Sequence, residues 1–272
     1  MEMNQVIGNE NLELAVSPMG AEMKSLVCKR TGRNLLWGAD PKIWEYTAPV
    51  CCPWCGKLED GYFEEKGKRY LTGMHGFTRE KPHRLVKKEE TSVTYLYEWT
   101  EDGDTWPWSF QLETVHRLEG EQAVTVCTVT NTGTEPMPVQ LGFHTGFLCP
   151  FSPEREVEDY CFRFEKEEAP DGTHILPVTR GMFDNRRIPF PGLSSEWIRL
   201  EERESGRYIQ LDLREFDYLL LWSVPGIPGF VCMEPWSGFN GKGHDLWKRP
   251  GTRKLMPGEQ LSRTQRLTIK ML

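Results

Sequence analysis

Four short segments each place a single polar side chain among apolar, glycine or proline residues. Glu234 closes an otherwise apolar run, and His144 follows a predicted strand. His75 lies between glycine-containing dipeptides, and Lys57 follows a proline-rich segment. A polar group in such surroundings loses solvation unless something pairs with it, so these four residues are candidates for a functional site.

Glu234 and His144 are residue types suited to acid–base chemistry. The flanking Met233, Pro235 and Trp236 desolvate the carboxylate, which raises its pKa toward a range where it can accept a proton at neutral pH. A histidine, with an ordinary pKa of about 6.5, can supply the complementary acid. A structural interpretation stays open, because polar residues at strand ends often only satisfy buried hydrogen bonds. Trp236 also suits a sugar, whose C–H faces stack on aromatic rings.

The elements that position these residues are predicted to be strands. Period-two alternation of apolar residues, which is typical of half-buried strands, recurs along the whole chain. The longest example predicts a hairpin of 108–118 and 124–130, with a second turn at 131–136 that leads into 139–143. Further strands are predicted at 12–16, 93–99, 207–213, 218–224, 229–234 and 264–271.

Many strands with almost no helix predict an all-β fold, a large antiparallel β-sandwich of two extended sheets packed face to face. The best candidate for a helix is short, with Asp40 as N-cap and an end at about Tyr46. No repeat, low-complexity tract or change of composition marks a linker, so residues 1–272 are interpreted as a single domain.

Composition narrows the possible partners. The 272 residues carry 33 Lys and Arg against 40 Asp and Glu, a net charge of −7, which argues against a sequence-independent grip on nucleic acid. No apolar stretch is long enough to span a bilayer, and the first residues do not resemble a signal peptide. We therefore expect a cytoplasmic protein, monomer or homodimer, that binds a small molecule and neither nucleic acid nor a membrane.

The cysteines do not predict a disulfide scaffold or a metal centre. There are eight, about 3% of the chain, against the ~8–10% of disulfide-rich scaffolds. Cys52 and Cys55 form a single CxxC pair, whereas a structural zinc site needs two such pairs or a pair with closely spaced histidines. No metal site is predicted, and His83, His116, His174 and His244 are interpreted as surface or core residues.

These segments together resemble the aldose 1-epimerase (galactose mutarotase-like) superfamily, most closely its LacX-type branch. No single segment is diagnostic, but their order and spacing are specific. The matching segments are 14–26, 36–44, 48–56, His75-Gly76-Phe77-Thr78-Arg79, 131–138, Gly142-Phe143-His144, 221–223, Glu234-Pro235-Trp236 and 255–259.

The resemblance implies a supersandwich with an open cleft that binds a free hexose. In the family, a glutamate at the position of Glu234 takes the proton of the anomeric hydroxyl while a histidine at the position of His144 donates one to the ring oxygen. The ring opens, rotation about C1–C2 exposes the other face of the aldehyde, and closure gives the opposite anomer. This reaction needs no metal or redox cofactor, only an acid and a base, which we expect about one pyranose apart.

The other site positions follow from the same resemblance. His75 is expected to hydrogen-bond sugar hydroxyls or to help polarise the ring oxygen, and Arg79 to orient the cleft or to serve as a structural ion-pair partner. Lys57 stands where many relatives have an arginine, which keeps the charge but loses the planar fork. Thr145 replaces the usual proline after the second histidine. For the aspartate that binds sugar hydroxyls in mutarotases, Asp184 is the candidate.

Two other functions remain open from the sequence. A hexose-6-phosphate 1-epimerase would run the same chemistry but needs cationic side chains that converge on a dianion. Candidates for that role are Lys57, Arg79, Arg155, Arg186 and Arg187. A non-catalytic carbohydrate-binding or sensing protein would keep the cleft without the reaction; the lysine at position 57 favours it, and retention of both Glu234 and His144 counts against it.

Overall fold

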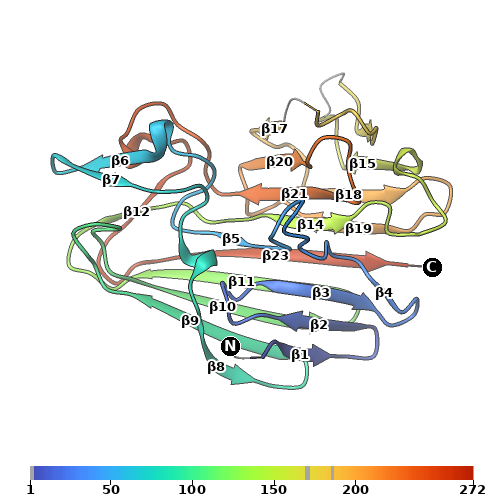
Figure 1. Ribbon diagram of the computed structural model, residues 1–272, viewed down its shortest axis with the longest axis horizontal. Helices are drawn as coiled ribbons and strands as arrows, with labels where there is room; N and C mark the ends of the chain where they lie inside the picture. The colour runs from blue at the N-terminus through green and yellow to red at the C-terminus, as the bar shows by residue number, and fades with distance from the viewer. Residues whose placement is uncertain (1–2, 169–171, 185–186, 272) are drawn as a thin grey trace.

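The protein is built from antiparallel β-sheets, as the computed structural model shows for residues 3–168, 172–184 and 187–271 (Figure 1). The predicted all-β class is confirmed. Helical structure in these ranges consists of single 3₁₀ turns, and none is long and apolar enough to cross a membrane. These turns are η1 (Glu59–Gly61), η2 (Thr78–Glu80), η3 (Val157–Asp159) and η4 (Leu246–Lys248).

A nine-stranded sheet forms the base of the molecule. Its longest pair is the predicted hairpin, which pairs Phe110 with Asn131 at one end and Glu119 with Gln122 at the other. In spatial order the strands are β16 (Ile175–Pro177), β15 (Tyr160–Phe164), β18 (Trp197–Glu202), β19 (Tyr208–Asp212), β23 (Gln260–Lys270), β11 (Gln122–Asn131), β10 (Phe110–Glu119), β9 (Ser92–Trp99) and β8 (Arg84–Lys88).

Two smaller sheets pack against this base and complete the sandwich. One buried cluster joins Leu14 and Leu26 of the first small sheet, Leu200 and Leu267 of the base, and Met233 of the second small sheet. The first small sheet has strands β1 (Gln5–Gly8), β2 (Leu12–Val16), β3 (Met23–Cys28) and β4 (Arg33–Asn34). The second has β17 (Ile188–Pro191), β20 (Tyr218–Trp222), β21 (Phe230–Trp236), β13 (Gly142–Phe143) and β5 (Val50–Cys51), and β14 (Thr145–Leu148) also pairs with β21.

A second buried cluster covers the other end of the base. It includes Trp54, Phe63, Trp106 and Trp108, and it fixes the segment that leads from β5 toward the hairpin of β6 (Tyr62–Glu65) and β7 (Lys68–Leu71). The rigid aromatic packing there anchors the loop that carries Lys57.

The expected helix at 40–46 is wrong. Asp40 does cap a turn, because its carbonyl accepts hydrogen bonds from the amides of Ile43 and Trp44 and its side chain accepts from Lys42, but no further turn follows. The reason is tertiary packing. The ring of Trp44 packs against Phe230 at 5.3 Å and against His144 at 4.9 Å, and these contacts outweigh the weak tendency of so short a segment to form a helix.

The predicted strand at 139–143 is divided between two sheets. Its beginning belongs to β12 (Met137–Val139), which pairs with β22 (Arg253–Leu255), whereas its end is β13 in the second small sheet. Gln140 lies where the chain passes from one sheet to the other, and its backbone N–H donates a hydrogen bond to the carbonyl of Pro53. The crossing delivers His144 to the second small sheet, which is called the site sheet below.

Candidate active site

The register of the site sheet places Glu234 and His144 side by side. Gly142 pairs with Trp236 and Thr145 pairs with Met233, so His144 lies directly across from Glu234 between these two pairs. Because side chains alternate along a strand, Glu234 faces away from the core that Met233 joins. The pairing register of β21 with β13 and β14 therefore places the carboxylate and the imidazole on one face.

That face forms the floor of a cleft of about 620 Å³, within the roughly 300–1,000 Å³ typical of small-molecule sites. The cleft brings together six of the seven site residues predicted from sequence, and also other aromatic and charged residues. The predicted residues that line it are Lys57, His75, Arg79, His144, Glu234 and Trp236, and among the others are Trp44, Tyr46, Arg187 and Trp222.

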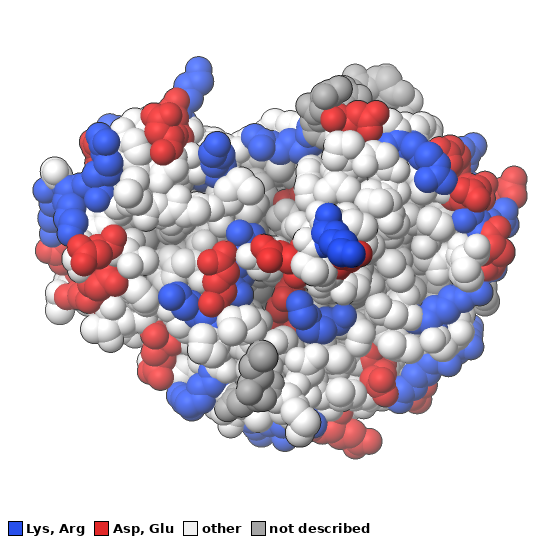
Figure 2. All heavy atoms as spheres, in the orientation of Figure 1, with Lys and Arg blue, Asp and Glu red and all other residues white. Residues whose placement is uncertain are grey.

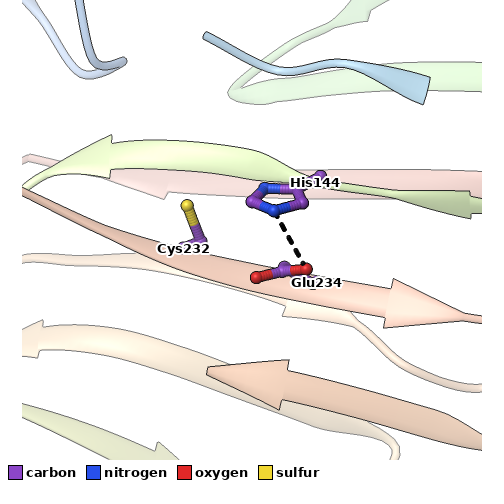
Figure 3. A group of neighbouring side chains, drawn as sticks. All are labelled: His144, Cys232 and Glu234. Atoms are coloured by element: carbon purple, nitrogen blue, oxygen red, sulfur yellow. Dashed lines mark ion pairs between the residues drawn. The ribbon is translucent and has the colours of Figure 1, made fainter. Parts of the chain in front are cut away.

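His144 and Glu234 contact each other directly. Nε2 of His144 lies 3.3 Å from Oε2 of Glu234 (Figure 3), and only 7% of His144 and 2% of Glu234 is exposed. The expected separation of one pyranose is too wide. The physical reason is that the two sugar oxygens that exchange protons, the anomeric oxygen and the ring oxygen, are bonded to the same carbon, so an acid and a base in contact suit the reaction better than a distant pair.

Burial dominates the protonation of this pair. Desolvation raises the pKa of Glu234 well above its usual value, and desolvation together with the nearby Arg79 lowers the pKa of His144 to about 3. Both shifts disfavour the charged forms, so the two groups hold one proton between them over a wide pH range. A pair of this kind can release a proton at one atom and accept one at the other.

His75 is held as a neutral donor. Its Nδ1 accepts a hydrogen bond from the backbone N–H of Gly56 at 3.1 Å, which assigns the ring proton to Nε2. Burial, and then the neighbouring His144 ring at 5.1 Å, lower the pKa of His75 well below its usual value. The turn itself requires glycine after the histidine, because Gly76 has φ +73° and a Cβ there would lie 1.8 Å from the carbonyl oxygen of Cys52.

Arg79 lines the cleft and is also an ion-pair partner of Glu80. Its guanidinium lies over the ring of Tyr46 at 4.4 Å, and its Nε lies 3.5 Å from the carboxylate of Glu80. Lys57 is exposed at the rim, where its backbone amide donates to the side chain of Asn240. The cleft therefore presents the positive charge of Arg79 near the imidazoles and that of Lys57 at its edge, and Arg187 also lines it.

Aromatic residues form the walls. Trp236 is 2% exposed and packs edge-on against His75 at 5.3 Å, so it supports that ring more than it offers a free face. Trp44 and Trp222 are half-buried and line the cleft, where their rings contact each other at 5.6 Å and His144 at 4.9 and 5.5 Å. Sequence reasoning missed these two tryptophans, although Trp222 is two residues along β20 from Leu220, the strand partner of Glu234, and its phase pointed to this face.

Asp184 lies outside the cleft. It is exposed, and its side chain accepts a hydrogen bond from the amide of Gly226 at 3.1 Å. The structure therefore does not bring Asp184 together with the other predicted site residues, because the short loop contact holds its carboxylate elsewhere. Arg187, three residues further along the chain, does line the cleft and was considered from sequence only as a possible phosphate ligand.

One group of potential metal ligands lies in this region. Ligand atoms of His144, Cys232 and Glu234 lie within 4.8 Å of one another (Figure 3), and no other group of three was found in the described part of the chain, so Cys52 and Cys55 belong to none there. Burial raises the pKa of Cys232 well above its usual value, which keeps it a thiol, and Nε2 of His144 already contacts Glu234. The arrangement suits proton transfer better than metal coordination.

Comparison with known proteins shows the family of this chain. The family model described as aldose 1-epimerase matches residues 3–188, and the chain belongs to that family. It is 29% identical, over 96% of its length and 97% of the relative's, to the chromosomal protein LacX of Lactococcus lactis subsp. lactis, and equally to the plasmid form.

Solved structures show the same fold. A galactose mutarotase related enzyme from Lactobacillus acidophilus superposes with a TM-score of 0.91 at 23% identity, covering 99% of this chain and 98% of that one. A galactose mutarotase-like protein from Lactobacillus casei gives a TM-score of 0.89, also at 23% identity, covering 98% and 100%. The predicted galactose mutarotase-like sandwich is confirmed.

The burial of Glu234 predicts a pH-dependent stability. Its pKa is raised in the folded protein, so the stability that it contributes is complete below its usual value of 4.5 and is lost as the pH rises through the raised value. Glu234→Gln removes this loss. We expect urea denaturation at about pH 9 to show the variant more stable than the parent by about 1–3 kcal/mol, with a smaller difference near pH 5.

The matched control is Glu45→Gln, which makes the same change at an exposed residue of the same cleft. It should lose as much stability between about pH 5 and pH 9 as the parent does. A Glu234→Gln protein that loses as much stability as the parent between the two pH values would contradict a desolvated carboxylate.

Proposed function

We propose that this protein catalyses interconversion of the α and β anomers of a free aldohexose, an aldose 1-epimerase (mutarotase) reaction that uses no cofactor. The observation that carries the proposal is the direct contact of His144 with Glu234 on the floor of a solvent-open cleft. The membership of the aldose 1-epimerase family supports the class of reaction.

In the proposed mechanism the shared proton first passes from the carboxyl group of Glu234 to Nε2 of His144, which leaves a carboxylate beside an imidazolium. The carboxylate accepts the proton of the anomeric hydroxyl, Nε2–H of the imidazolium donates a proton to the ring oxygen, and the C1–O5 bond breaks as the C1 carbonyl forms. Both groups are then neutral again, which is the form that burial favours. After rotation about C1–C2, Glu234 returns its proton to the carbonyl oxygen, His144 takes back the proton of the O5 hydroxyl, and the ring closes on the other face.

Other cleft residues have binding roles in this proposal. The neutral His75 donates from Nε2 to a sugar oxygen without adding a charge near the pair. Trp44 and Trp222 offer aromatic surface to the C–H faces of the pyranose. Arg79 and Lys57 contact hydroxyl groups, whereas Asp184 has no part in binding.

The volume of the cleft, about 620 Å³, suits a small-molecule substrate. We propose a diffusible sugar as the partner of a cytoplasmic monomer or homodimer, and neither nucleic acid nor a membrane. Figure 2 supports this choice, because acidic and basic side chains are interspersed over the face in view and do not gather into one basic surface.

A hexose phosphate is the second candidate substrate, because three cationic residues, Lys57, Arg79 and Arg187, line the same cleft. Two observations favour the neutral sugar. The guanidinium of Arg79 is engaged with Tyr46 and Glu80, and the carboxylates of Glu45 and Glu80 also line the cleft.

We therefore expect kcat/KM for D-glucose to exceed that for D-glucose 6-phosphate by about tenfold or more, since the carboxylates of Glu45 and Glu80 repel the phosphate dianion. The two sugars would be compared by polarimetry of freshly dissolved α anomers. Faster turnover of the phosphate, with the preference lost in Arg187→Met, would instead identify a sugar-phosphate epimerase.

The role of Glu234 predicts the effect of an isosteric substitution. Glu234→Gln keeps the shape but cannot accept a proton, so we expect the catalysed rate of α-D-glucose or α-D-galactose mutarotation to fall by about 10²–10⁴-fold while sugar binding persists. Glu45→Gln is the control and should retain most of the rate. A parent rate equal to the buffer blank with common aldohexoses would favour the non-catalytic binding protein, and normal turnover by Glu234→Gln would exclude Glu234 as the base.

A further inference from the structure

Arg249 is a buried cation without a carboxylate partner among the described residues. Only 5% of it is exposed, and burial lowers its pKa to about 10. Its side chain instead donates to two backbone carbonyls, from Nη2 to Cys55 at 2.6 Å and from Nη1 to Lys57 at 3.2 Å. Burying a guanidinium without an opposite charge is costly, so these two contacts call for a functional explanation.

The carbonyl of Cys55 and the amide N–H of Gly56 belong to one peptide group. The carbonyl accepts from Arg249, and the N–H donates to Nδ1 of His75 at 3.1 Å. In a planar trans peptide these two bonds point in opposite directions, so the group bridges the guanidinium and the imidazole. A positive charge at the carbonyl oxygen also polarises the peptide, which makes its N–H a stronger donor.

The neighbouring groups of this loop hold the peptide in the same orientation. The side-chain oxygen of Gln140 accepts from the amide of Cys55 at 3.1 Å, and that of Asn240 accepts from the amide of Lys57 at 3.0 Å. The amide of His75 donates back to the carbonyl of Gly56 at 2.9 Å. Gly56 has φ +72°, and a Cβ there would lie 2.0 Å from the side-chain oxygen of Asn240, so the loop takes this shape only with glycine at position 56.

We propose that Arg249 is a positioning residue for the candidate active site: through the peptide between Cys55 and Gly56 it fixes His75 as a neutral imidazole whose proton is on Nε2. The inference rests on the proposed function, because the proton on Nε2 of His75 is the one that His75 donates to the sugar. Arg249 itself does not touch the substrate in this account.

Several other groups face His75 and also bear on its protonation. The thiol of Cys51 lies 3.2 Å from Nδ1, and the ring of His144 lies 5.1 Å away. Burial is the main cause of the lowered pKa of His75, followed by His144 and then by the positive charges of Arg79, Arg187 and Arg249. Removing Arg249 therefore takes away a positive charge that repels a proton from His75. It also takes away the contact that aligns the Gly56 N–H with Nδ1 of His75. Both changes ease protonation of Nδ1.

The test is the imidazole spectrum of His75 in Arg249→Met. Long-range ¹H–¹⁵N correlation spectra of the full-length protein, assigned with His75→Gln, report which ring nitrogen carries the proton. We expect only the Nε2–H form in the parent between about pH 5 and 8, and detectable protonation of Nδ1 in the variant at the lower end of that range. We also expect kcat/KM of Arg249→Met to fall about threefold to tenfold below that of the parent as the pH is lowered across this range.

Two further variants make the test specific. Arg263→Met removes another partly buried arginine, one that lines a different surface pocket, and should leave the His75 signals unchanged. Arg249→Lys keeps the charge but cannot hold both carbonyls, so its Nδ1 protonation should lie between those of the parent and Arg249→Met; it also decides the question if Arg249→Met does not fold.

The inference is overturned if a folded Arg249→Met, or a folded Arg249→Lys where the first does not fold, shows His75 signals identical to the parent. The spectra do not depend on turnover. If Arg249→Met shifts the tautomer and the parent has no mutarotase activity, the role of Arg249 is retained and the proposed function is rejected. If the spectra are unchanged and the parent is active, the role of Arg249 is rejected and the proposed function is retained.

Discussion

The direct contact between His144 and Glu234 is the constraint on which the rest of the site depends. A charged carboxylate at Glu234 and a charged imidazole at His144 would each be costly in this buried position. Because the two groups are in contact, they can share a single proton. The contact exists because β13 and β14 keep one register along β21. The packed core behind Met233 holds that register, since a slip of one residue would turn Glu234 into the core.

The groups that contact the pair are mostly uncharged. His75 is kept neutral by burial and by the Gly56 amide, and the rings of Trp44 and Trp222 pack beside His144. The positive charge of Arg79 acts on His144 and helps burial to lower its pKa. Lys57 and Arg187 also line the cleft, and Lys57 lies exposed at its rim.

Much of this arrangement could be predicted from the sequence because it is local. The apolar run 229–233 predicts a buried strand, and the apolar neighbours of Glu234 predict the desolvation of its carboxylate. What could not be predicted depends on contacts between distant segments. The His144–Glu234 distance is set by strand register, the turn at Asp40 by the packing of Trp44, the position of Asp184 by a bond to Gly226, and the link from Arg249 to His75 by a shared peptide.

The most direct test is a crystal structure of Glu234→Gln with D-glucose or D-galactose bound, because the variant retains the shape of the cleft and slows turnover. The account predicts that the anomeric oxygen lies within hydrogen-bonding distance, about 3.2 Å, of the residue 234 side chain, and that the ring oxygen lies at a similar distance from Nε2 of His144. A sugar bound with C1 directed away from both side chains, or bound outside the cleft, would contradict it.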